Sequence, residues 1–168
     1  MPIDFFDNPH KQTTSVGRFG LCDDVAPEDC PKTPAYIKES DEDNWTAEVV
    51  NPQQKTPTFY PIDNCIEILR PNGEMDNRCD GLLEYNGKLI FVELKDRAGG
   101  KWVGEGLKQL AVTIENFKKH HNIAEYTSIR AQLCNKQRPL AVVSCKTIVE
   151  KFKDDTGCIV SVDRNIII

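Results

Sequence analysis

The sequence lacks the features that mark membrane, exported and zinc-binding proteins. No apolar run approaches the ~20 residues that cross a bilayer, and the acidic start M-P-I-D-F-F-D-N-P-H differs from the basic start of a signal peptide. The seven cysteines include no Cys-x-x-Cys pair, and none of the three histidines has zinc-ligand spacing to a cysteine pair. We therefore expect a cytoplasmic protein with reduced cysteines and no membrane partner.

An overall excess of positive charge, which many nucleic-acid-binding proteins have, is also absent, because the net charge is −5. Residues 1–63 hold 12 acids and 5 bases, whereas residues 88–119 hold seven bases and four acids. A locally basic surface can attract a polyanion to an acidic protein, although such mixed charge is equally typical of a solvated helix face. Arg97, Lys101 and Lys108 are the predicted nucleic-acid contacts.

The length and a hydrophobic content of 39% suit one domain over residues 1–168. Residues 1–44 have weak periodicity and predict an irregular acidic arm, with a short helix near 26–30, packed over a core formed by residues 45–168. The expected strands are 45–50, 59–69, 78–85, 88–95, 139–144, 158–162 and 166–168, and the expected helices are 104–121, 123–133 and 147–153. Apolar residues on both faces of the strands at 78–95 predict an α/β fold with cover on both faces.

The stretch C-D-G-L-L-E-Y-N-G-K-L-I-F-V-E-L-K, residues 79–95, predicts a β-hairpin closed by Asn86-Gly87. A two-residue loop pairs residue 85 with residue 88, so Asp80 lies opposite Glu93 on one face. Lys95 follows two residues later on that same face. Like charges placed opposite each other destabilise a ladder, so this pairing needs a physical reason.

A divalent cation is one such reason. Directly opposed side chains have Cβ atoms roughly 4.5–5.5 Å apart, and two carboxylates at that distance cannot both ionise cheaply without a cation between them. Mg²⁺ takes oxygen ligands, and Lys95 would direct a positive charge at a bound water or phosphate, as phosphoester hydrolysis requires. The alternative is a pair of solvent-facing edge residues with Lys95 as a salt-bridge partner worth ~0–1 kcal/mol.

Asp80 followed by Glu93-Leu94-Lys95, with L-K-Q-L on the next helix, resembles the PD-(D/E)XK nuclease superfamily. The resemblance covers about residues 59–144 and is to small bacterial members of the superfamily. It implies a restriction-endonuclease-like core, a mixed central β-sheet flanked by helices. Cys79 stands where the family name has proline.

The resemblance implies that Asp80 and Glu93 bind Mg²⁺ or Mn²⁺, that Lys95 acts on the water, and that Gln109 borders the site. A further acid is expected upstream, and the chain offers Asp63 or Glu67. The implied function is a metal-dependent nuclease acting on DNA, with RNA as the second candidate substrate. The alternative is a non-catalytic binding or immunity module built on the same fold, and the sequence gives no oligomeric state.

Overall fold

The computed structural model describes residues 2–137 and 145–168. Within these ranges neither helix has the length and apolarity to cross a lipid bilayer. The elements, in chain order, are β1 (Gln12–Thr13), β2 (Arg18–Cys22), β3 (Tyr36–Lys38), the 3-10 turn η1 (Glu42–Asn44), β4 (Ala47–Val50), β5 (Thr58–Pro61), β6 (Gly81–Tyr85), β7 (Lys88–Lys95), α1 (Trp102–His120), the 3-10 turn η2 (Ile123–Glu125), β8 (Ser128–Asn135), α2 (Cys145–Thr156), β9 (Ile159–Val162) and β10 (Asn165–Ile167).

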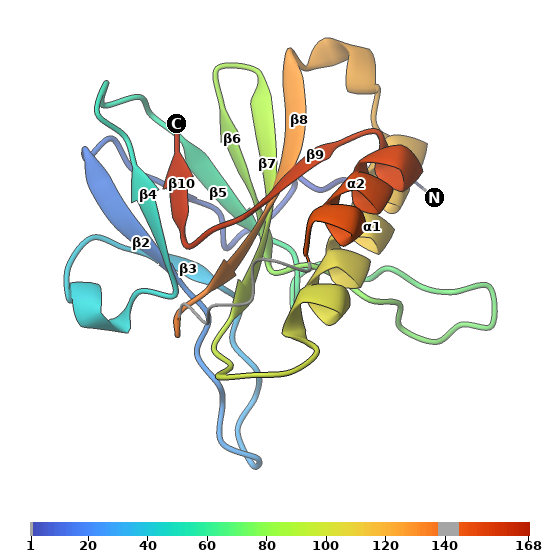
Figure 1. Cartoon of the computed structure of the whole chain (residues 1–168), viewed down its shortest axis with the longest axis horizontal. Helices are drawn as coiled ribbons and strands as arrows, with labels where there is room; N and C mark the ends of the chain where they lie inside the picture. Colours follow the sequence, from blue (N-terminus) through green and yellow to red (C-terminus); the bar gives the residue numbers. More distant parts are fainter. Residues whose placement is uncertain (1, 138–144) are drawn as a thin grey trace.

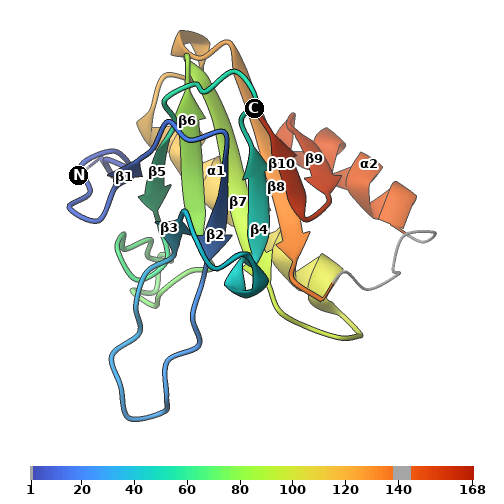
Figure 2. The same cartoon turned by 90° about the vertical axis from the view of Figure 1, so that its left-hand side faces the viewer.

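These elements form three layers. A six-stranded sheet in the order β1-β5-β6-β7-β8-β9 lies in the middle, and its β7, β8 and β9 strands run parallel while the others pair antiparallel. Helices α1 and α2 cover one face, and a second sheet in the order β10-β4-β2-β3 covers the other (Figure 1). The side view in Figure 2 shows the second sheet lying across the central strands.

The alternating side chains of β6 and β7 explain this layering. Leu82 and Phe91 are fully buried in the cluster that faces the helices, whereas Leu83 and Val92 are fully buried against the second sheet. A sheet that is apolar on both faces must be covered on both. The predicted α/β class is confirmed, but helices flank only one face, and a β-sheet covers the other.

The predicted irregular arm at residues 1–44 is wrong. β2 is an inner strand of the second sheet, paired with β3 on one side and β4 on the other, and its Phe19 and Leu21 are fully buried. The expected helix near residues 26–30 is only a turn, in which the Cys30 N–H donates to the Pro27 carbonyl at 2.9 Å. These short strands gain stability from pairing with distant strands, which local periodicity does not register.

Two other expected elements also differ. The strand predicted over 59–69 ends at Pro61, because Asn64 turns the chain with a φ of 63°. The helix predicted over 123–133 is wrong, since this segment contains η2 and most of β8, which pairs parallel with β7. The strand expected at 139–144 lies outside the described residues. The helices expected at 104–121 and 147–153 correspond to α1 and α2.

Gly81 is the first residue of β6 and follows Asp80. It packs closely against the Phe59 ring. A Cβ added at Gly81 would lie 2.2 Å from the Phe59 ring, so Phe59 or the strand would have to move. We expect Gly81→Ala to lower the free energy of unfolding by roughly 1–3 kcal/mol, the usual cost of overpacking a core. Gly99→Ala is the control, because its Cβ meets no atom within 4 Å. Urea titrations of both variants measure the difference, and equal midpoints would contradict this packing argument.

Candidate active site

The predicted hairpin register is confirmed. β6 and β7 pair from Gly81↔Val92 to Tyr85↔Lys88, and both turn residues have positive φ, 49° at Asn86 and 72° at Gly87. The ladder ends at Gly81↔Val92, and Asp80 and Glu93 are the next residues on the two strands. Asp80, Glu93 and Lys95 therefore meet where β6 begins and β7 ends, and Lys95 contacts Gln109 of α1.

Asp80 is buried, and its carboxylate binds the backbone N–H of Leu94, which lies beyond the last residue pair of the β6–β7 ladder. Its residue is only 6% exposed, and its Oδ2 accepts a hydrogen bond from the Leu94 N–H at 2.6 Å. The Asp80 carbonyl accepts from the Ile62 N–H at 2.9 Å, which extends the pairing with β5. The Asp80 backbone is thus held by the segment that follows β5, and its carboxylate is held by β7.

Glu93 is more deeply buried, with 1% of the residue exposed. Its Oε1 pairs with Lys95 Nζ at 2.8 Å, while its Oε2 has no hydrogen-bond partner among the described residues. A buried oxygen without a partner is costly, so this atom fits a ligand position, and a divalent cation suits its chemistry.

Lys95 is held from two sides. Its side chain is 11% exposed, and its Nζ donates to Gln109 Oε1 at 2.6 Å in addition to pairing with Glu93. The Gln109 amide is itself oriented, because its Nε2 donates to the Arg78 carbonyl at 3.1 Å. The structure thus brings Gln109 to the predicted site and gives it a definite role, which is to position the lysine.

Burial raises the pKa values of both carboxyls. Burial first, and then the Glu93 charge, raises the pKa of Asp80 well above its ordinary value. Burial raises the pKa of Glu93 to about 7, although the Lys95 charge acts against this rise. Without a cation the pair therefore retains a proton near neutral pH, and a divalent cation would compete with that proton.

Of the two upstream acids predicted for the site, only Asp63 lies close enough to matter electrostatically. Its charge helps to raise the pKa values of Asp80 and Glu93, and its Oδ1 pairs with Arg78 Nη2 at 2.8 Å. Glu67 is exposed and makes no hydrogen bond or ion pair described for this region. Asp63 lies in a turn rather than on the strand that was expected to carry it.

Asp23 is an acid that the sequence interpretation missed. It directly follows β2, and burial first, then the Asp63 charge, raises its pKa to about 6, while the charge of Lys95 lowers it. Its own charge also raises the pKa values of Asp80 and Glu93. The only sequence signal was an Asp-Asp pair after the apolar run F-G-L-C, inside a segment that had been assigned to an irregular arm.

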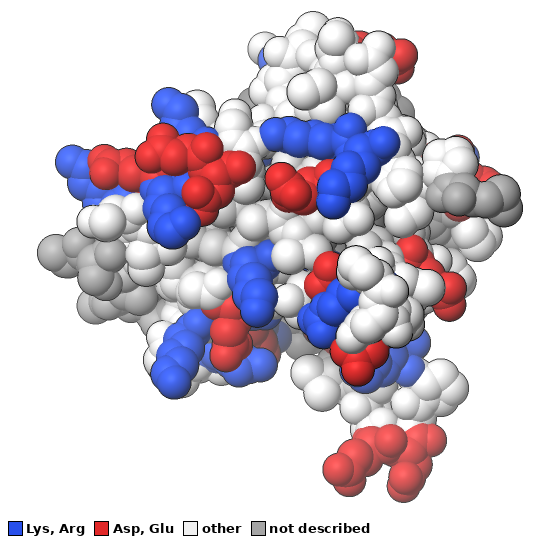
Figure 3. Space-filling view, turned by 90° about the vertical axis from the view of Figure 1, so that its right-hand side faces the viewer, with Lys and Arg blue, Asp and Glu red and all other residues white. Residues whose placement is uncertain are grey.

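The predicted nucleic-acid contacts do not form a continuous basic surface. Arg97 pairs with Glu105 at 3.6 Å, Lys101 is exposed just before α1, and Lys108 is exposed beside Gln109. Figure 3, viewed from the side of α1 and α2, shows Lys and Arg side chains interspersed with Asp and Glu.

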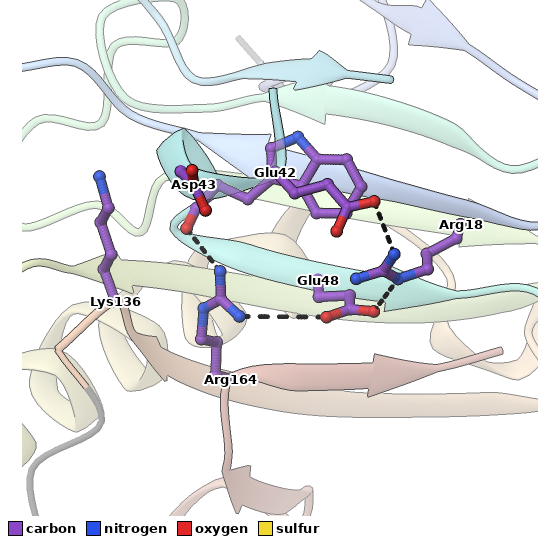
Figure 4. Close-up of a pocket in the computed structure, with 7 residues that line it drawn as sticks. Arg18, Glu42, Asp43, Glu48, Lys136 and Arg164 are labelled. Atoms are coloured by element: carbon purple, nitrogen blue, oxygen red, sulfur yellow. Dashed lines mark hydrogen bonds and ion pairs between the residues drawn. The ribbon is translucent and has the colours of Figure 1, made fainter. Parts of the chain in front are cut away.

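A separate polar hollow of about 280 Å³ lies beside η1 and β4, away from the paired carboxylates. Figure 4 shows Arg18 between Glu42 and Glu48, and Arg164 on the other side of Glu48. Arg18 also lies over the Trp45 ring, 5.3 Å from its centroid. Arg18, Glu42, Glu48 and Arg164 form a structural ion-pair network in this hollow, which joins η1, β2 and β4.

Over the described residues, no group of three or more His, Cys, Asp and Glu side chains has metal-site geometry. The candidate metal centre is therefore the two-carboxylate pair Asp80 and Glu93. Comparison of the chain with protein-family models, curated proteins and solved structures finds no match.

Proposed function

We propose that the protein is a metal-dependent nuclease that hydrolyses phosphodiester bonds of DNA, with a restriction-endonuclease-like core. The observation that carries the proposal is the Oε2 of the buried Glu93, which has no hydrogen-bond partner within residues 2–137 and 145–168, while Lys95 Nζ lies 2.8 Å from the other Glu93 oxygen. Seven free thiols support the cytosol as its location. RNA is the less favoured substrate.

In this proposal Asp80 and Glu93 hold Mg²⁺ or Mn²⁺. The bound ion would lower the pKa of a water and polarise a phosphoryl oxygen. Asp80 keeps its orientation through the Leu94 N–H, so it presents its carboxylate to the ion without rearranging the strand. Glu93 presents Oε2 while Oε1 remains paired with Lys95.

Lys95 supplies the positive charge beside the reacting phosphate. Gln109 Oε1 holds Nζ at 2.6 Å, so the ammonium group keeps its position when a cation takes up part of the Glu93 charge. From there Nζ donates a hydrogen bond to a phosphoryl oxygen or to the attacking water. Such a fixed charge stabilises the transition state more than the ground state, because negative charge develops there.

Cleavage assays test the proposal. We expect the protein with Mn²⁺ or Mg²⁺ to cut plasmid DNA or circular single-stranded DNA, and EDTA to stop the reaction. Glu93→Gln should be inactive, because it removes a ligand charge while keeping the shape. Asp154→Asn, an exposed change on α2, is the matched control and should cut normally. A folded protein that cuts none of the DNA substrates with either ion would contradict the proposal, and cleavage of RNA alone would reassign its substrate.

One observation favours the alternative of a non-catalytic binding or immunity module. Asp23 and Asp63 add negative charge around the carboxylate pair, which opposes the approach of a polyanion when no cation is bound. A module that has lost its chemistry should bind no ion. A melting temperature unaffected by Mg²⁺, Mn²⁺ or EDTA, together with no cleavage, would favour this second function.

A further inference from the structure

His121 connects the end of α1 to the N-terminal segment. Its backbone N–H donates to the Phe117 carbonyl at 2.9 Å, which closes the last helical turn. Its ring stacks on Phe117 with centroids 4.4 Å apart and an interplanar angle of 14°. Its Nε2 accepts a hydrogen bond from the Phe5 N–H at 3.3 Å. One imidazole thus contacts both the helix and the segment before β1.

The segment that it holds is strongly apolar. Phe5 is fully buried in the helix-side core, and its ring meets Phe117 edge-on at 5.3 Å. Phe6 meets the His121 ring at 5.3 Å and Tyr60 at 5.1 Å. Further along, Asn8 Nδ2 donates to the Pro61 carbonyl at 2.5 Å. Release of residues 3–6 would therefore expose aromatic surface while Asn8 still anchors the chain to β5.

The hydrogen bond from Phe5 requires a lone pair on Nε2, so the ring that holds the segment is neutral. A protonated ring would place one N–H donor against another. Burial lowers the pKa of His121 from its ordinary value, and the neighbouring His120 on α1 adds to this. Asp4 and the Ile3 carbonyl on the segment, and Glu125 on η2, act in the opposite direction. Burial is the largest of these effects.

We propose that His121 is a pH-operated latch: the neutral imidazole holds residues 3–6 on α1, and protonation releases them. His121 binds a proton more weakly when the segment is latched than when it is released. Latching is therefore at full strength above the pKa of a free imidazole, about 6.5, and weakens as the pH falls below that value. Because one proton is linked to release, the equilibrium constant between the latched and released states changes by at most about tenfold per pH unit.

Amide hydrogen exchange tests the latch. The protection factor of the Phe5 amide, corrected for intrinsic exchange at each pH, should be constant from pH 8 to 7. It should then fall several-fold to tenfold per pH unit below about 6.5. The Phe91 amide on β7 should keep its protection, which separates local release from global unfolding. His121→Gln retains an acceptor without a titration and should make the Phe5 value independent of pH, whereas His120→Gln should behave like the wild type.

Either of two exchange results would overturn the proposal. Constant Phe5 protection between pH 8 and 5 would do so, and so would an unaltered pH dependence in His121→Gln. The His121 ring proton signals give an independent reading by NMR. The loss of Phe5 protection should have the same pH midpoint as the titration of the His121 ring. A different midpoint would mean that another group controls the loss of protection.

Discussion

The Lys95→Ala variant is expected to lose DNA cleavage by a factor on the order of 10²–10³, the usual effect of removing one preorganised electrostatic contact. Its cation affinity should stay within a few-fold of wild type at pH 8.5. That pH matters because the Lys95 charge lowers the pKa of Glu93. Without the lysine, Glu93 holds its proton to higher pH, and at pH 7 this proton would compete with the cation.

Two measurements separate the roles of the lysine. Single-turnover cleavage reports its effect on the chemical step, and calorimetric titration with Mn²⁺ reports its effect on the ion. Lys151→Ala on α2 is the control, because Lys151 is exposed and pairs only with Asp155 in the described part of its surroundings. If Lys95→Ala cuts at the wild-type rate, the ammonium is a structural partner of Glu93, and the mechanism proposed for it is wrong.

The central hairpin was predictable because its information is local. Asn86-Gly87 specifies the turn, the turn specifies the register, and the register brings Asp80 and Glu93 to the same end of the hairpin. The apolar residues of α1 follow a 4-3-4-3 spacing at positions 103, 107, 110, 114 and 117. This pattern also lies within one segment, and it predicted the helix with small errors at its ends. The side chains that these two elements bring together, Lys95 and Gln109, were therefore within reach of sequence reasoning.

The second sheet and β8 were not predictable in this way. β2 is stabilised by strands that lie farther along the chain, as in the pairing of Phe19 with Val49, and no local pattern records that pairing. β8 contains Arg130, Ala131, Gln132 and Leu133, which favour helices as an isolated segment. Parallel pairing between β7 and β9 overrides that preference. Asp23 was missed for the same reason, because its place near the site depends on where β2 ends.

The Asp80→Asn variant is expected to be more stable than wild type when no cation is present. The substitution keeps an oxygen that can accept from the Leu94 N–H and removes one of two opposed charges. The Asp80 pKa is raised in the folded state, so protonation favours folding, and the wild type loses this stability as the pH rises through that folded-state pKa. At pH 8 in EDTA we expect the relief of repulsion to add on the order of 0.5–1 kcal/mol, which corresponds to a melting temperature about 1–4 °C higher.

The same variant should lose the stabilisation that Mg²⁺ gives to the wild type. A ligand that binds only the folded state raises the free energy of unfolding by RT ln(1 + [L]/Kd), so weaker binding removes the gain directly. Asp154→Asn on α2 controls for the change in net charge and should follow the wild type in both buffers. Four melting temperatures, for wild type and Asp80→Asn in EDTA and in Mg²⁺, test both halves of the argument. A structural acid predicts the opposite pattern: Asp80→Asn would melt lower in EDTA and still gain from Mg²⁺, and the paired-carboxylate centre would then have to be abandoned.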